Sequence, residues 1–112
     1  MMKILVKRTL HYYIEKYPLA EKQLLAWAEE FQKWEYSNFN EIKNVFRNAS
    51  IVANNRVIFN IKGNDFRLIV SLNFNQNVCY VIWFGTHKDY DKINAETVSY
   101  DKNINNFKKR EL

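Results

Sequence analysis

The sequence is poor in the residues that interrupt or cross-link a chain: its 112 residues include one cysteine, one proline and two glycines. A single cysteine excludes an internal disulfide and a zinc site built from several cysteines. With 47% hydrophobic and 16% aromatic residues, the composition also excludes a disordered or linker-rich chain and predicts one packed domain. No apolar run approaches the roughly 20 residues that cross a bilayer.

The first residues lack the pattern of a secretory signal. Their apolar stretch is about four residues long, against roughly 7–15 for a signal core, and Lys7 and Arg8 interrupt it. We therefore expect a cytoplasmic protein that is not in a membrane. The net charge of +5 favours a polyanionic partner, most often nucleic acid, although a domain can be basic without one.

Helical spacing dominates the first half of the chain. A first helix is expected to follow Thr9 as its cap and to end before Pro18, because the residue before a proline is pushed out of the helical region. A second, longer helix runs to about Tyr36. Asn38 and Glu41 have the spacing of a capping box and predict a short third helix.

Residues 56–85 change to the two-residue alternation of β-strands. Turn residues at 62–65 and 75–77 divide this stretch into a three-stranded meander. A strand expected at residues 2–6 must join the same sheet, because so short a segment cannot bury itself. The sequence therefore predicts an α+β domain with helices packed on one face of an antiparallel sheet. The residues expected in the core beneath the long helix are Trp27, Phe31, Phe59, Leu68, Val70 and Ile82.

The last part of the chain is mostly polar. We assign residues 1–98 to the domain and residues 99–112 to a tail. Few of the tail residues can pack, and Phe107 is the only large apolar side chain near the end. The tail is therefore expected to fray or to depend on a partner.

Turn arithmetic brings two basic groups to one end of the sheet. If the hairpins fold around residues 63–64 and 76, Arg67 lies opposite Asn60 on one side and close to Gly85 on the other, beside His87. Arginine can clamp a phosphate with two parallel hydrogen bonds and stabilise charge that builds there. Histidine can move a proton near neutral pH.

Plainer interpretations of both residues stay open. Arg67 can be a strand arginine paired with a carboxylate, and His87 can be a solvated loop residue. Asp91, one turn further along, can orient an imidazole or cap a helix. The chain has no Ser-His-Asp order, no glycine-rich phosphate loop and no metal-ligand spacing, so we predict neither a cofactor nor a metal site.

Two segments carry a family resemblance. NNRVIFNIKGNDFRLIV, residues 54–70, and WFGTHKDYDKI, residues 83–93, together resemble the HigB family of type II toxin–antitoxin toxins. The first contains an R-x-x-F-N-I-x-G-N-x-x-R-L block and the second a G-T-H-x-x-Y-D block. The similarity covers roughly residues 2–95 and leaves the tail outside.

The resemblance implies a fold, an activity and partners. The fold would be the RelE-like microbial ribonuclease fold: an N-terminal strand and two helices packed on an antiparallel sheet that ends in a three-stranded meander. The activity would be that of an mRNA interferase, a metal-independent endoribonuclease that cuts mRNA on translating ribosomes. A HigA-like helix-turn-helix antitoxin would neutralise it, and operator DNA would be bound only through the complex of the two proteins.

The resemblance also implies roles for residues. Arg67 would stabilise transition-state charge, His87 would act as acid or base, and Tyr90 would stack on a base or assist proton transfer. Asp91 would orient the imidazole. The residues expected to contact RNA phosphates are Arg56, Lys62 and Lys88. The alternative function is a binding module for RNA or protein that has the same fold and cuts nothing.

Overall fold

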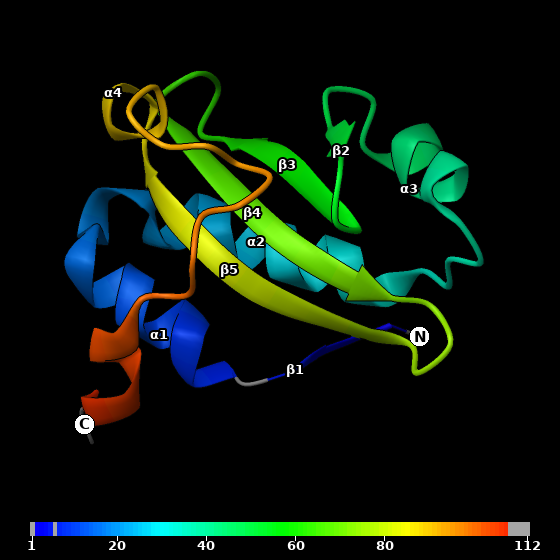
Figure 1. Cartoon of the computed structure of the whole chain (residues 1–112), viewed down its shortest axis with the longest axis horizontal. Helices are drawn as coiled ribbons and strands as arrows, with labels where there is room; N and C mark the ends of the chain where they lie inside the picture. The colour runs from blue at the N-terminus through cyan, green and yellow to red at the C-terminus, as the bar shows by residue number, and fades with distance from the viewer. Residues whose placement is uncertain (1, 6, 108–112) are drawn as a thin grey trace.

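The structure, a computed structural model, describes residues 2–5 and 7–107. Within these residues five strands form one sheet in the order β1-β5-β4-β3-β2 (Figure 1). Neighbouring strands are antiparallel except β1 and β5, which are parallel. The strands are β1 (Lys3–Leu5), β2 (Ser50–Val52), β3 (Arg56–Ile61), β4 (Phe66–Asn73) and β5 (Val78–Thr86).

The helices pack mainly on one side of this sheet, which confirms the predicted α+β class. They are α1 (Lys7–Lys16), the 3₁₀ turn η1 (Pro18–Ala20), α2 (Glu21–Lys33), α3 (Phe39–Val45), α4 (His87–Tyr90) and the 3₁₀ turn η2 (Lys102–Asn106). Figure 1 shows α2 behind the sheet, with α1 beside β5. No helix within the described ranges is long and apolar enough to span a membrane.

The helix ends agree with the sequence at Pro18 and differ at Thr9. Pro18 separates α1 from α2 and is the first residue of η1. Thr9 is not a cap: α1 already begins at Lys7, and Thr9 is buried inside it. At the third helix, Asn38 Oδ1 accepts from the backbone N–H of Glu41 at 3.1 Å, as the capping spacing predicts.

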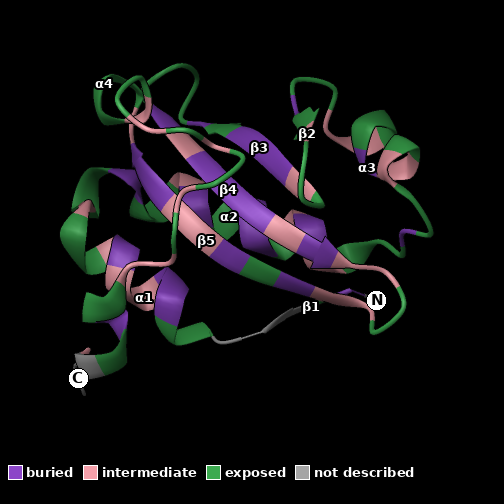
Figure 2. Cartoon of the chain, in the orientation of Figure 1, coloured by how far each residue is buried: buried purple, intermediate pink, exposed green. Residues whose placement is uncertain are grey.

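The core is aromatic and lies between α2 and the sheet. Trp27 and Phe31 from α2 are 5% and 0% exposed, and their rings stack with centroids 5.1 Å apart. Phe31 also meets Phe59 of β3 edge-to-face. Figure 2 shows the buried residues concentrated along β3, β4 and β5 and on the side of α2 that faces them. We call this side of the sheet the inner face.

A β-bulge shifts the inner face along β5. Val81 pairs with Val70 and Trp83 with Ile69, so Ile82 is an extra residue without a partner across the strand. The predicted core position of Ile82 is therefore wrong. Ile82 is only half buried, whereas Val81 and Phe84 are buried. The other predicted core residues, Trp27, Phe31, Phe59, Leu68 and Val70, are all buried.

The C-terminal segment packs on α1, which corrects the expectation that it frays. Ile104 is fully buried, and Tyr12 of α1 donates a hydrogen bond to Asp101 at 2.9 Å. The rings of Tyr12 and Phe107 meet edge-to-face at 5.6 Å. Ile104 and Phe107, with Tyr100 partly buried against the core, thus dock a segment that is otherwise polar. The rest of the predicted tail, residues 108–112, lies outside the described residues, as does Val6 of the predicted first strand.

Candidate functional site

The hairpin register at one end of the sheet is the one that the turn arithmetic predicts. Arg67 of β4 pairs with Asn60 of β3 and with Gly85 of β5. Lys62 and Gly63 begin the β3–β4 turn with φ angles of 55° and 63°, in the left-handed region that glycine adopts freely. The structure therefore places Arg67 on an inner strand, next to two chain connections.

The guanidinium of Arg67 is held by its own turn. It donates to the carbonyl oxygens of Phe66 at 3.0 Å and Asn64 at 3.3 Å, and it lies 5.9 Å from the centroid of the Tyr90 ring. The aromatic ring and the carbonyls fix the direction of a planar, permanently charged group. Because the side chain is only half buried, its remaining N–H groups can reach a ligand from solvent.

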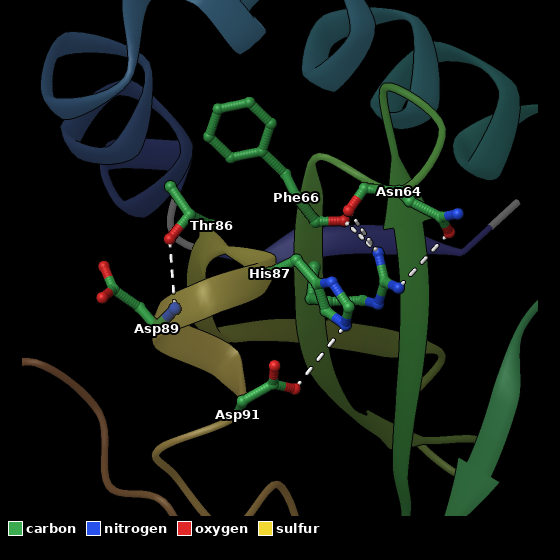
Figure 3. Close-up of polar contacts among 7 residues, drawn as sticks. Asn64, Phe66, Thr86, His87, Asp89 and Asp91 are labelled. Atoms are coloured by element: carbon green, nitrogen blue, oxygen red, sulfur yellow. Dashed lines mark hydrogen bonds and ion pairs between the residues drawn. The ribbon is translucent and has the colours of Figure 1, made fainter.

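Helix α4 places His87 against the same turn. The backbone N–H of His87 donates to the carbonyl of Asp65 at 2.9 Å, and the Thr86 hydroxyl caps the helix by accepting from Asp89 N–H at 3.1 Å. The His87 Nε2 atom lies 3.6 Å from Asp91 Oδ1, within ion-pair distance when the imidazole is protonated. Figure 3 shows the His87 ring and the Asp91 carboxylate facing each other. Half of the His87 side chain remains exposed, so its proton can exchange with a substrate.

Trp83 completes the face beside Tyr90, and sequence reasoning did not include it in the site. Its ring lies 6.2 Å from that of Tyr90. A Cβ built on Gly85 would stand 2.6 Å from Trp83 Cη2, so the indole covers Gly85 closely. Glycine at this position therefore lets the indole lie against its own strand. The sequence feature that could have indicated this contact is the Trp-x-Gly spacing of residues 83–85, directly before Thr86 and His87.

Two of the three residues predicted to contact phosphates lie at this end of the sheet. Lys62 is in the β3–β4 turn, where its Nζ lies 3.4 Å from Asp65 Oδ2, and Lys88 is exposed on α4. Arg56 is placed elsewhere, at the far end of β3 opposite Ser71. The structure thus gathers Lys62, Arg67, His87, Lys88, Tyr90 and Asp91 and leaves Arg56 apart.

Arg56 holds a chain segment in place. Its guanidinium donates to the carbonyls of Ala95 and Val98, both at 2.9 Å. Asn54 adds a hydrogen bond to the carbonyl of Glu96 at 2.7 Å. Figure 1 shows the segment of residues 91–98 crossing the side of the sheet opposite α2, which we call the outer face. Arg56 therefore has a structural role that the sequence pattern did not indicate.

Cys79 and His11 are not part of this candidate site. Cys79 is fully buried, and burial raises the pKa of its thiol far above the ordinary value. His11 lies on α1, remote in sequence from the paired motifs. Among residues 2–5 and 7–107, no group of three or more His, Cys, Asp or Glu side chains could hold a metal ion.

Taken together, the geometry provides an anchored guanidinium, an exposed imidazole with a carboxylate partner, and two aromatic rings. A guanidinium can bind a phosphate and an imidazole can transfer a proton to or from it. Exposed aromatic rings can stack on unpaired bases. This set defines a candidate site for cleaving or binding RNA.

Comparisons with known proteins place the chain in a family. Residues 20–93 match the model of the HigB_toxin family, described as a RelE-like toxic component of a toxin–antitoxin system. Because the match covers more than half of the chain, the protein belongs to this family, as the sequence motifs indicate. The matched region includes Arg67, His87, Tyr90 and Asp91.

Individual relatives carry more specific names. The chain is 27% identical over 96 residues to the mRNA interferase toxin HigB of Escherichia coli strain K12, a match that covers 84% of this chain and 92% of the relative. The proteins named mRNA interferase HigB from Escherichia coli O157:H7 and Shigella flexneri match with the same identity and coverage.

Proposed function

We propose that the protein is an mRNA interferase: an endoribonuclease that acts as the toxin of its toxin–antitoxin pair. The observation that carries this proposal is the attachment of Arg67 and His87 to one turn. Arg67 donates to the carbonyl of Asn64 in the β3–β4 turn. The backbone N–H of His87 donates to the carbonyl of Asp65 in the same turn. The names of the relatives from Escherichia coli and Shigella flexneri support the same activity.

The proposed reaction is attack of a ribose 2′-OH on the adjacent phosphorus. The P–O5′ bond breaks, a 2′,3′-cyclic phosphate forms, and the departing 5′-oxygen takes up a proton. Protein groups can supply everything this step needs: an acceptor for the 2′-OH proton, a donor for the 5′-oxygen and a cation for the charge on phosphorus. The proposal therefore assigns no metal to the step.

Each site residue receives one task in this reaction. Arg67 binds the non-bridging phosphate oxygens and stabilises their charge as attack proceeds. His87 transfers a proton, and Asp91 orients its imidazole. Tyr90 supports the guanidinium through its ring and presents a surface for an unstacked base.

The substrate and partners follow from the family assignment and the charge. Lys62 and Lys88 extend the positive surface on either side of Arg67 and are proposed to hold RNA phosphates. We further propose that the mRNA is cut on translating ribosomes in the cytoplasm. A HigA-like helix-turn-helix antitoxin would neutralise the protein and carry it to operator DNA. A short helix-turn-helix reading frame next to this gene would support that partner.

Induced expression tests the activity. We expect growth arrest, with new mRNA 5′ ends that primer extension maps inside coding sequences. Analysis of the fragments should find 2′,3′-cyclic phosphates and 5′-hydroxyls. Ends with 5′-phosphates would contradict the 2′-OH mechanism but not cleavage itself. If the folded protein cut nothing, even on translating ribosomes, the binding module without catalysis would replace the interferase.

A further inference from the structure

A cavity of about 280 Å³ lies beside the candidate site. Its walls come from α1, β5, α4 and the start of the docked C-terminal segment. Trp83 belongs to both places, because it lines the cavity and its ring lies 6.2 Å from that of Tyr90. Trp83 contacts Tyr90, and the Tyr90 ring lies 5.9 Å from the Arg67 guanidinium, so the cavity and the candidate site are neighbours. None of the functional assignments above uses the cavity.

The size and aromatic lining suit one flat ring. Sites for drug-sized ligands occupy roughly 300–1,000 Å³, so this cavity is at the small end of that range. Tyr17, Trp83 and Phe84 line it, and the rings of Tyr17 and Phe84 meet edge-to-face at 5.8 Å. Aromatic walls of this kind are where proteins stack single nucleobases.

The charges of the cavity argue against a phosphate. Two lysines, Lys16 and Lys92, and two aspartates, Asp89 and Asp101, line it, so its formal charge balances. A phosphate would meet both carboxylates, whereas an uncharged polar ring would not be repelled. The Arg67 guanidinium, which has no ion pair with a carboxylate within the described residues, is better placed for the RNA backbone.

Asp89 is the carboxylate with free accepting capacity. Asp101 already accepts from the Tyr12 hydroxyl and from the backbone N–H of Asn103. No hydrogen bond or ion pair to the carboxylate of Asp89 is found within the described part of the chain; only its backbone is used, in the cap of α4. Figure 3 shows this carboxylate pointing away from His87. Burial raises the pKa of Tyr17, and the nearby Asp89 charge raises it further, which agrees with both facing the same space.

Tyr13 adds a buried polar group without a partner. Its side chain lines the cavity and is 2% exposed, yet its hydroxyl makes no hydrogen bond. Burial raises the pKa of the Tyr13 phenol far above its ordinary value, so the hydroxyl keeps its proton. An unpaired buried hydroxyl costs free energy, and a bound polar ligand could remove that cost.

We infer that this cavity binds one unstacked RNA base that carries an exocyclic amino group, next to the phosphate that is cut. Adenine, cytosine and guanine present amino donors, whereas uracil presents only carbonyl acceptors where adenine or cytosine would donate. The Asp89 carboxylate accepts the amino group, and the rings of Trp83 and Tyr17 hold the base. This inference rests on the proposed RNA cleavage for its biological meaning, but binding of the base can be measured without it.

Titration with free nucleosides tests the cavity directly. Adenosine, cytidine and uridine lack a phosphate, so phosphate binding by Arg67 cannot account for their binding. In ¹⁵N–¹H NMR spectra of the full chain, adenosine or cytidine should shift the Trp83 indole and the Asp89 amide. Uridine should bind about tenfold more weakly, the effect of losing one hydrogen bond to a charged group.

Matched variants separate the carboxylate from general charge. In Asp89→Asn the shape is kept and an amide donor is gained, so the preference over uridine should fall several-fold. Glu29→Gln, on the exposed side of α2, removes the same charge elsewhere and should leave the preference intact. Equal binding of all three nucleosides, or shifts confined to other surfaces, would overturn the inference. So would shifts of these residues by an antitoxin but by no nucleoside, because the cavity would then belong to a protein partner.

Cleavage mapping links the cavity to the reaction. Among the mRNA ends produced on induction, uracil should be depleted at one position flanking the cut, and Asp89→Asn should reduce that depletion. Cleavage with no base preference at any flanking position would overturn the inference and leave the interferase standing. If no mRNA were cut, the interferase would fail, and the nucleoside titration alone would decide the cavity.

Discussion

The two faces of the sheet differ in what they bury. On the inner face, Phe59, Leu68 and Val70 are at most 2% exposed and belong to the hydrophobic core that α2 and the strands share. On the outer face, Ile58 and Ile69 are also buried, but Arg67 lies two residues before Ile69 on the same strand. One face contains only the core, whereas the other combines a small apolar patch with charged groups.

This difference separates stability from chemistry. The strands are the same on both faces, so substitutions on the inner face change packing while those at the Arg67 end change polar groups that solvent already reaches. Arg56 is the exception on the outer face, because it bonds to the carbonyls of segment 91–98. An inner-face substitution that leaves stability unchanged would contradict this separation. So would a substitution at the Arg67 end that unfolds the chain.

The largest effect is expected at His87, without loss of stability. His87→Ala should slow mRNA cleavage by about 10²–10⁴-fold if the imidazole transfers a proton. The pH–rate profile should lose one limb, which single-turnover cleavage at several pH values would reveal. Because half of the side chain is exposed, the melting temperature should stay within a degree or two of the parent. An unchanged rate would remove His87 from the mechanism.

Phe31→Ala should have the largest effect on stability. Phe31 is fully buried and contacts four aromatic rings, those of Trp27, Tyr36, Phe46 and Phe59. Removing a buried phenylalanine costs about 3–5 kcal/mol, a large part of the stability of a domain this size. Urea unfolding measures the loss. Leu25→Ala on the exposed side of α2 is the matched control and should cost far less.

The docked C-terminal segment should contribute a smaller share. Ile104→Ala should cost about 2–5 kcal/mol, towards the lower value because the neighbouring segment can relax into the space. Deleting residues 99–112 should lower the melting temperature for the same reason. If neither change lowered the free energy of unfolding, the contacts of Ile104 and Phe107 with α1 would contribute nothing to stability.

The smallest of the expected effects is the weakening of RNA binding by salt. Three phosphate contacts, from Lys62, Arg67 and Lys88, predict a slope near −2 in log affinity against log salt for single-stranded RNA, a loss of roughly 20-fold between 50 and 200 mM. Binding is measured with mRNA that carries a 2′-deoxy nucleotide at the cut site. Lys62→Gln should make the slope less steep by about 0.7. Lys22→Gln on α2 should not change it.

Local pattern was enough for the elements and for the register of the meander. Period two between residues 56 and 85 and the turn residues at Gly63 and Gln76 place Arg67 opposite Gly85, because side-chain direction and turn length fix a hairpin. The family motifs then predict which residues at that end carry the chemistry. These roles stay predictions.

The misses share a physical cause, which is contact between distant segments. The bulge at Ile82 inserts an unpaired residue that an alternating pattern cannot reveal. Ile104 and Phe107 looked too sparse to pack, yet α1 offers Tyr12 as a partner 89 residues away from Asp101. Arg56 is basic and looked available for RNA, but carbonyls about 40 residues further along the chain occupy its guanidinium. Such pairings depend on the tertiary fold.

The most direct test of the account is the single-turnover cleavage rate of Arg67 variants on translating ribosomes. The substrate is one defined mRNA, and Arg8→Ala, an exposed arginine on α1, is the control. The account predicts that Arg67→Ala cuts about 10²–10³-fold more slowly at an unchanged melting temperature. Arg67→Lys should recover only part of the rate because it cannot form the two-pronged phosphate contact. A folded Arg67→Ala protein that cuts mRNA as fast as the parent would contradict the proposed site.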